Sequence, residues 1–270
     1  QSDFTEAQFV VDEIKAQIND GQMRKEIAIL YRANAQSRVI EHNLFNAGIP
    51  YRVYGGLRFF ERAEVKSALS YLRLLDNPHD DTAFIRVVNF PARGIGARTL
   101  ELLQDAARLH NCSLWSAVPY ATGAGAAKLI GFTRMIDGLR FDTQHLPLPE
   151  LVDHVIAHST LITHYQADKE GQDRIENLQE LVNAAAAFTQ IEGHAVDATA
   201  LQTETDIITP LAGFLSHAAL EAGDNQALAG QDAVQLMTVH AAKGLEFKTV
   251  FILGLEEGLF PHENSLNEQG

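Results

Sequence analysis

The sequence has little of what stabilises a secreted or membrane-spanning protein. It contains one cysteine, Cys112, among 270 residues, so no disulfide can form within the chain. Such cysteine usage fits a reducing cytoplasm, and we interpret Cys112 as a small buried or idle thiol rather than a nucleophile. No apolar run approaches the roughly 18 residues that a transmembrane helix needs, and no signal peptide opens the chain. These absences predict a cytoplasmic protein with no membrane partner.

Positive charge is also scarce, but only in one part of the chain. The net charge is −14, whereas residues 1–110 contain 14 Lys/Arg and 14 Asp/Glu and residues 111–270 contain 7 against 21. Between Arg24 and Arg98 there are 12 basic and 7 acidic residues, and most of the basic ones are arginine. The planar guanidinium binds phosphate through two bonds at once. Charge alone favours a solvated, salt-bridged surface and leaves phosphate binding open.

The start of the chain has the rhythm of an α/β layer. Apolar residues recur at helical spacing from about Thr5, and Asn19-Asp20-Gly21 ends that pattern. The run Ile27-Ala-Ile-Leu-Tyr31 has no polar alternation, which is typical of a parallel strand buried on both faces. A helix from Ser37 to Phe45 and a short strand from Tyr51 to Tyr54 follow. This β-α-β order indicates part of an α/β domain.

The pattern changes after Gly56. From Arg62 to about Ala222 it predicts successive helices and no strand, and strands return at residues 233–238 and 249–253. The clearest helices are Ala63–Leu75, Asp81–Val88, Ala97–His110, Ala124–Leu139, Asp173–Phe188 and Thr209–Ala222. We therefore predict a partial parallel-sheet α/β domain interrupted by a large all-helical inserted domain. Gly55-Gly56 and Gly230 would be the crossing points, and spacing alone leaves a hinge and ordinary turn glycines equally open.

One stretch, from Val234 to Phe247, has the strongest chemical signal. A buried strand ends at Thr238, and the following loop presents polar groups and a glycine, namely His240, Lys243, Gly244 and Glu246. Ligands of parallel α/β sheets bind at the carboxyl ends of the strands. Hydroxyl, imidazole and backbone N–H groups donate to phosphate, and a glutamate accepts from a sugar hydroxyl. The ordered string therefore predicts a ligand-binding loop.

A second candidate lies in the helical part, at Pro91–Leu100. Gly94, Ile95 and Gly96 precede a predicted helix, and glycines there let backbone N–H groups approach a phosphate. Arg93, Arg98 and Thr99 add two positive charges and a hydroxyl. Such loops hold duplex backbone phosphate without reading bases. Without other information, however, a simple helix-start turn is the better interpretation.

Other suggestive motifs have simpler explanations. Residues 76–81 contain possible metal ligands, but a solvated loop with a helix cap accounts for them. Gly123-Ala-Gly-Ala-Ala-Lys128 lacks the spacing of a phosphate-binding P-loop. No histidine set has metal-ligand spacing, so no metal site is predicted.

Several of these strings together resemble the UvrD/Rep/PcrA-type superfamily 1A DNA helicases. Val234–Phe247 is similar to the family's motif V, and Val250–His262 to the segment that follows it. Ile29–Arg38 and Pro50–Arg62 resemble another signature block. The likeness extends from about Phe9 to His110, weakens, and resumes at Arg174, Phe214 and Gln231.

The resemblance implies that different segments of the chain belong to different domains and bind different ligands. Residues 1–54 and 231–270 would belong to the second RecA-like motor domain, and residues 55–230 to the helical insertion called domain 2B. The residues expected to contact single-stranded DNA are Thr238 and His240, together with Arg32, Arg38 and Arg58, whose positions face the strand or the domain junction. Those expected at the ATP site are Lys243, Gly244 and Glu246, with Glu246 near the ribose. Those expected at duplex DNA are Arg93, Gly94, Ile95, Gly96, Arg98 and Thr99.

The resemblance also implies that the chain is part of a longer enzyme. Nucleotide hydrolysis by this class needs a phosphate-binding loop with its lysine and a carboxylate for Mg²⁺. We expect these groups before Gln1 and an arginine-bearing motif after Gly270, so that the fragment is inactive and carries no cofactor alone. The parent would be a bacterial, nucleoid-associated ATP- and Mg²⁺-dependent 3′–5′ helicase of repair or replication, with possible repair-protein partners. The alternative is a stand-alone helical interaction or regulatory module.

Overall fold

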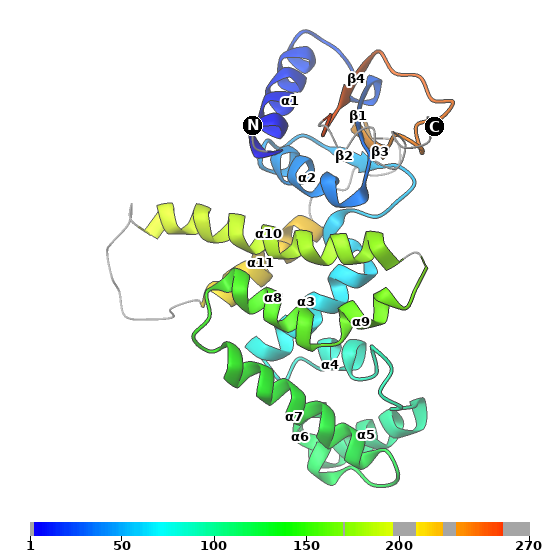
Figure 1. Ribbon diagram of the computed structural model, residues 1–270, viewed down its shortest axis with the longest axis vertical. Helices are drawn as coiled ribbons and strands as arrows, with labels where there is room; N and C mark the ends of the chain where they lie inside the picture. The colour runs from blue at the N-terminus through cyan, green and yellow to red at the C-terminus, as the bar shows by residue number, and fades with distance from the viewer. Residues whose placement is uncertain (1–2, 170, 197–208, 224–230, 256–270) are drawn as a thin grey trace, which may run out of the picture. The chain divides into compact units, whose positions relative to one another are not determined.

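The computed structural model describes residues 3–169, 171–196, 209–223 and 231–255 (Figure 1). The chain divides into two compact units, one from residues 1–62 and 218–270 and the other from residues 63–217. The sequence predicted crossing points near Gly55 and Gly230 instead. Gly55 adopts a positive φ of 76°, and Gly230 lies outside the described residues.

The first unit is built on a parallel sheet of four strands in the order β2-β3-β1-β4. The strands are β1 (Ile27–Tyr31), β2 (Tyr51–Val53), β3 (Val234–Thr238) and β4 (Thr249–Ile252). The predicted α/β class with a parallel sheet is confirmed. Strands from the two ends of the chain alternate in the sheet, because β3 lies between β1 and β2. The two terminal segments are therefore parts of one folded unit.

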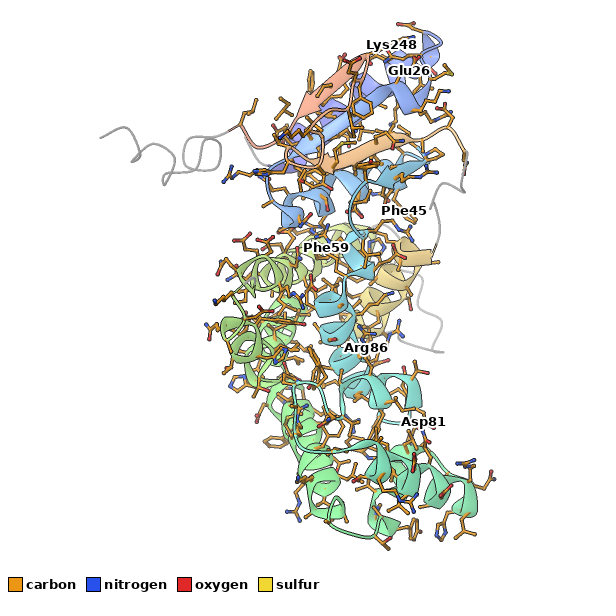
Figure 2. The ribbon with its side chains drawn as sticks, turned by 90° about the vertical axis from the view of Figure 1, so that its right-hand side faces the viewer. Glu26, Phe45, Phe59, Asp81, Arg86 and Lys248 are labelled. Carbon is orange, nitrogen blue, oxygen red and sulfur yellow. The ribbon has the colours of Figure 1, made fainter. Side chains whose placement is uncertain are left out.

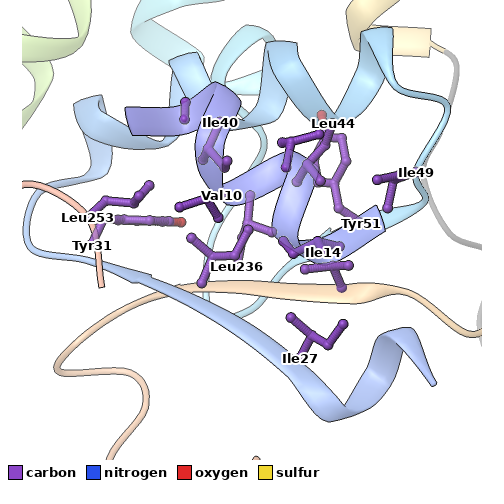
Figure 3. Close-up of a cluster of buried hydrophobic side chains, with 14 residues drawn as sticks. Val10, Ile14, Ile27, Tyr31, Ile40, Leu44, Ile49, Tyr51, Leu236 and Leu253 are labelled. Carbon is purple, nitrogen blue, oxygen red and sulfur yellow. The ribbon is translucent and has the colours of Figure 1, made fainter. Parts of the chain in front are cut away.

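Helices α1 (Asp3–Asn19) and α2 (Ser37–Asn46) pack on one face of this sheet (Figures 1 and 3). Val10 and Ile14 on α1 and Ile40 and Leu44 on α2 are buried against strand residues such as Leu236. Their spacing of four residues places each pair on one helix face. Each fully buried aliphatic side chain contributes about 1.5–3 kcal/mol through the area removed from water.

Polar contacts set the positions of the strands at their amino-terminal edge. The Asp232 carboxylate, just before β3, accepts from the backbone N–H groups of Arg24 and Lys25 at 3.0 and 2.8 Å. These bonds and the nearby cations lower its pKa against the effect of partial burial. Lys248, just before β4, forms an ion pair with Glu26 at 2.7 Å (Figure 2). Strands distant in sequence are thus aligned by short contacts at their starts.

The second unit contains no strand among its described residues. Its helices are α3 (Ala63–Asp76), α4 (Asp81–Val87), α5 (Ala97–His110), α6 (Leu114–Ala117), α7 (Ala126–Thr143), α8 (Leu148–His158), α9 (Leu161–Gln166) and α10 (Gly171–Val196). Helix α11 (Pro210–Gly223) starts in this unit and ends in the first. Within the described residues, no helix is long and apolar enough to span a bilayer.

Most of the predicted helices are confirmed, with ends displaced by a few residues, although α10 continues from the predicted end at Phe188 to Val196. The expected helix cap is also present, because the Asp80 side chain accepts from the backbone N–H of Ala83 at 2.9 Å (α4 is labelled by Asp81 and Arg86 in Figure 2). Helices α8 and α9, and the four-residue α6, were not predicted from the sequence. All three are helices of 11 residues or fewer, and α9 begins after Thr160, whose φ of 68° interrupts the pattern.

Candidate nucleotide and nucleic-acid interface

The loop after β3 lies at the carboxyl edge of the sheet and is exposed. His240, Lys243, Gly244 and Glu246 are all exposed, whereas Leu236 and Met237 before them are fully buried. The Thr238 hydroxyl accepts from the backbone N–H of Ala241 at 3.2 Å, which shapes the first turn. Gly244 has a φ of 82°, a left-handed conformation that side chains disfavour. The loop is therefore exposed to solvent and is anchored by the buried strand that precedes it.

The end of β1 lies directly beside this loop. Tyr31 is paired in register with Thr238, and its carbonyl accepts from the N–H of Val239 at 2.9 Å. Arg32 is the next residue along and is half-buried. The Gln36 side chain accepts from the N–H groups of Arg32 and Ala33 at 3.0 Å each. Arg32 and Thr238 are thus brought together from positions more than two hundred residues apart.

The end of β2 reaches the same loop. A Cβ atom built at Gly55 would lie 3.6 Å from the Cβ of Ala241. At the end of β4, Gly254 donates to the Glu6 carboxylate at 3.3 Å, and a Cβ there would lie 2.5 Å from Nε2 of Gln36. The ends of β1 and β2 therefore lie beside the Thr238 loop, and the end of β4 lies beside Gln36 in the segment that follows β1. The edge combines hydroxyl, imidazole, guanidinium and ammonium donors with one exposed carboxylate, Glu246, which suits a phosphate-and-sugar ligand.

Arg58 lies elsewhere, inside the first unit. It is 5% exposed, and its guanidinium donates to the Glu61 carboxylate at 3.0 Å, to the carbonyl of Glu221 at 3.3 Å and to the carbonyl of Ala222. The guanidinium thus holds the C-terminal end of α11 rather than facing a DNA strand. We therefore interpret Arg58 as a structural residue. Arg38, on α2, is half-buried.

A buried carboxylate, Glu41, organises the segment that follows β2. It accepts from the Ser37 hydroxyl at 2.6 Å and the Phe59 N–H at 3.0 Å, and it lies 3.7 Å from Arg62. Burial raises the pKa of Glu41, and Arg62, Ser37 and Phe59 oppose that rise. The same carboxylate and burial raise the pKa of Tyr31. Because these bonds attach residues 58–62 to α2, the compact unit extends beyond Gly55.

In the helical unit, the loop before α5 has a buried support and an exposed rim. Asn89 Oδ1 accepts from the N–H groups of Arg93 and Ile95 at 2.8 and 3.0 Å, and the Ile95 side chain is 1% exposed. Gly94 and Gly96 are exposed, Thr99 is half-buried, and the Arg98 side chain is 77% exposed. Arg98 pairs with Glu101 at 3.1 Å on the surface. The rim is therefore available to a ligand, whereas Ile95 serves packing.

Arg93 belongs to the support rather than to the rim. Its guanidinium donates to the Tyr71 hydroxyl at 2.7 Å and to three carbonyls at 3.0–3.2 Å, those of Val87, Pro91 and Ser159. It also lies over the rings of Tyr71 and Phe132 at 5.7 and 5.5 Å. Burial raises the pKa of Tyr71 to about 12, although Arg93 lowers it in part. Arg93 is therefore a structural cation.

Two residues at these surfaces were missed by sequence reasoning. Gln36 shapes the backbone around Arg32, and Lys128 donates to the carbonyl of Gly94 at 2.9 Å. Lys128 was considered only as part of a failed P-loop, and its position 34 residues from Gly94 gave no local signal. The only sequence signal for Gln36 was its position within Ile29–Arg38, the stretch that resembles a family signature block.

Comparison with known proteins agrees with this arrangement. The UvrD-like helicase C-terminal domain matches residues 1–123 and 133–270. DNA helicase II of Escherichia coli strain K12 is 50% identical, covering 100% of this chain and 37% of the relative. The ATP-dependent DNA helicase PcrA of Bacillus subtilis strain 168 is 39% identical, covering 99% of this chain and 36% of the relative.

The chain spans a little over a third of the length of these curated relatives. The family match covers well over half of the chain and includes the Thr238–Glu246 loop, Arg32 and the Gly94–Thr99 loop. The chain therefore belongs to the UvrD-like helicase C-terminal domain family.

Proposed function

We propose that the protein containing this chain is an ATP-dependent DNA helicase that moves 3′ to 5′ on DNA during repair or replication. One observation carries this proposal: the exposed Thr238–Glu246 loop lies beside Arg32 at the carboxyl edge of a parallel sheet. Ligands of such sheets bind at that edge. The relatives that match the whole chain are named as DNA helicases, which supports DNA as the substrate.

At the sheet edge, we assign the DNA strand and the nucleotide to different parts of one loop. Thr238, His240 and Arg32 would donate to the backbone phosphates of single-stranded DNA, with Arg38 nearby on α2. Lys243, Gly244 and Glu246 would form one wall of the ATP cleft, with the Glu246 carboxylate accepting from the ribose. Mg²⁺ and a phosphate-binding lysine would neutralise charge at the transferred phosphate. We assign that lysine and the Mg²⁺ ligands to the remainder of the longer protein.

In the helical unit, we assign duplex DNA to the rim at Gly94, Gly96, Arg98 and Thr99. Exposed backbone N–H groups at a helix start and a hydroxyl hold phosphate without reading bases. Affinity at this surface would therefore depend on salt and little on sequence.

The first experiment compares the activity of the chain with that of the longer protein. DNA-stimulated ATP hydrolysis and strand separation would be measured on the 270-residue chain and on the longer protein that contains it. We expect turnover only in the longer protein. Turnover by the chain alone, or none by either, contradicts the proposal.

The second experiment tests the sheet edge with a matched pair of charge changes. Arg32→Gln removes a cation at the carboxyl edge, and Lys248→Gln removes one at the amino edge, where its side chain is 70% exposed. We expect Arg32→Gln to weaken binding of a fluorescent single strand by about tenfold to a hundredfold, since a hydrogen bond to a charged group contributes about 1.5–3 kcal/mol. Lys248→Gln should bind like the unmodified chain. Equal losses in both variants would mean that the strand does not contact this edge.

A further inference from the structure

Lys128, which the sequence offered only as part of a rejected P-loop string, lies against the rim of the Gly94–Thr99 loop. It is the third residue of α7, and its Nζ donates to the exposed carbonyl of Gly94 at 2.9 Å. A Cβ atom at Gly94 would lie 2.5 Å from that Nζ, so the glycine leaves room for the ammonium group. A Cβ at Gly125 would collide with the Thr99 side chain. The start of α7 therefore packs directly on the start of α5.

The charges at these two helix starts are unusual. A helix N-terminus carries positive partial charge and normally favours acidic residues in its first turn. Neither α5 nor α7 has an acidic residue there, and each has a cation instead, Arg98 and Lys128. Two cations beside two packed helix N-termini form a surface that favours a bound anion.

Lys128 is also better placed for such an anion than Arg93. The Arg93 guanidinium is committed to three carbonyls and a tyrosine hydroxyl, whereas an ammonium group has three donors and Lys128 uses one on Gly94. Lys128 is exposed, and among the described residues it forms no ion pair. Arg98, in contrast, forms an ion pair with Glu101.

We propose that Lys128 is a duplex-binding residue that contacts a backbone phosphate of double-stranded DNA beside the Gly94–Thr99 rim. This inference rests on the proposed duplex-binding role of that rim and extends it to α7. In the free protein Lys128 positions the Gly94 carbonyl, and in the complex its remaining donors face the phosphate. The surface therefore takes its positive charge from Arg98 and Lys128, and Arg93 holds the loop from beneath.

The test measures salt dependence, which a purely structural role does not change. Binding of the full 270-residue chain to a fluorescent blunt duplex would be followed by anisotropy at several salt concentrations. The variants are Lys128→Gln, Lys128→Arg and Arg98→Gln at the rim. Arg134→Gln, which removes an exposed cation further along α7, is the control on the same helix. Circular dichroism verifies that each variant is folded.

We expect Lys128→Gln to lower the slope of log affinity against log salt by about 0.9, the value for one lost phosphate contact. Raising salt from about 50 to about 200 mM then weakens the unmodified chain about 3.5-fold more than this variant. Lys128→Arg should retain the original slope, and Arg134→Gln should change it much less than Lys128→Gln.

Two results overturn the inference while leaving duplex binding by the rim intact. One is an unchanged slope in Lys128→Gln when Arg98→Gln lowers it, and the other is an equal loss in Arg134→Gln, which would indicate a general charge effect. If the unmodified chain binds duplex with no salt dependence, the proposed duplex-binding role fails, and the inference about Lys128 fails with it.

Discussion

Replacing Arg93 by alanine should destabilise the helical unit far more than it should affect DNA contacts. The change removes one donor from three carbonyls and from the Tyr71 hydroxyl, and it removes stacking on two rings. The carbonyls of Val87 and Ser159 keep a second donor, whereas that of Pro91 loses its cation. A buried acceptor without a donor costs about 1–3 kcal/mol, and a cation over a ring contributes about 0.5–2 kcal/mol. Because Arg93 is half-buried, water compensates part of this. We expect a loss of about 3–5 kcal/mol in the free energy of unfolding.

Urea unfolding followed by circular dichroism measures this loss. With a slope of about 2 kcal/mol per M, the transition of the helical unit should move down by about 1.5–2.5 M. Hydrogen exchange of peptides from α3 and from residues 159–165 should speed up as well, because both regions contact Arg93 or its partners.

Arg98→Ala is the matched control, because its side chain is 77% exposed and its ion pair with Glu101 is on the surface. Such pairs contribute little, so the urea transition should hardly move, whereas the salt dependence of duplex binding should fall. If Arg93→Ala unfolds at the original urea concentration and loses duplex affinity instead, the structural role assigned to Arg93 is wrong.

Three further changes test the packing. Gly125→Ala should lower the free energy of unfolding by about 1–3 kcal/mol, because its Cβ atom would collide with Thr99. Gly131→Ala is the control, because its Cβ atom meets open space; it should be neutral or stabilise by up to about 1 kcal/mol. Thermal melts measure both changes. Tyr71 has its pKa raised to about 12 by burial, so the unfolded state loses this proton first and stability falls by about 1 kcal/mol between pH 10 and pH 11. In urea titrations, Tyr71→Phe should show a decrease smaller by about 1 kcal/mol, because other buried tyrosines such as Tyr165 also have raised pKa values and still contribute. An identical decrease in the variant would contradict the burial effect. Arg58→Ala should cost about 2–4 kcal/mol, because it leaves carbonyls at the end of α11 and a carboxylate without their donor; an unchanged urea transition would contradict this.

Local patterns were sufficient for most of the elements and for the composition of the site. The unalternated run Ile27–Tyr31 predicted a buried parallel strand, and β1 has those bounds. The string after Val234 predicted a strand followed by a polar loop at the sheet edge, and the structure has both. These predictions succeed because strand burial and helix periodicity depend on residues close together in sequence. Whether the loop binds ATP and DNA is still a prediction.

Sequence patterns could not distinguish the arginines that are structural from the one that is exposed. Arg58, Arg93 and Arg98 look alike in a sequence that resembles a DNA-binding family, and all three were predicted to contact DNA. Their surroundings differ because the neighbours come from distant segments: Glu221 and Ala222 for Arg58, and Tyr71 and Ser159 for Arg93. Only Arg98 has an exposed guanidinium.

By itself, the sequence determined the α/β class, the helical insertion and the loop that follows β3. Each of these features depends on the pattern of neighbouring residues within a single stretch of sequence. Tertiary structure alone decided which cations are structural and which face solvent, and it alone brought Lys128 to Gly94 and Arg32 to Thr238. The physical reason is that burial and hydrogen bonding of a long side chain depend on what packs around it. That packing is a property of the folded chain and not of any short stretch of it.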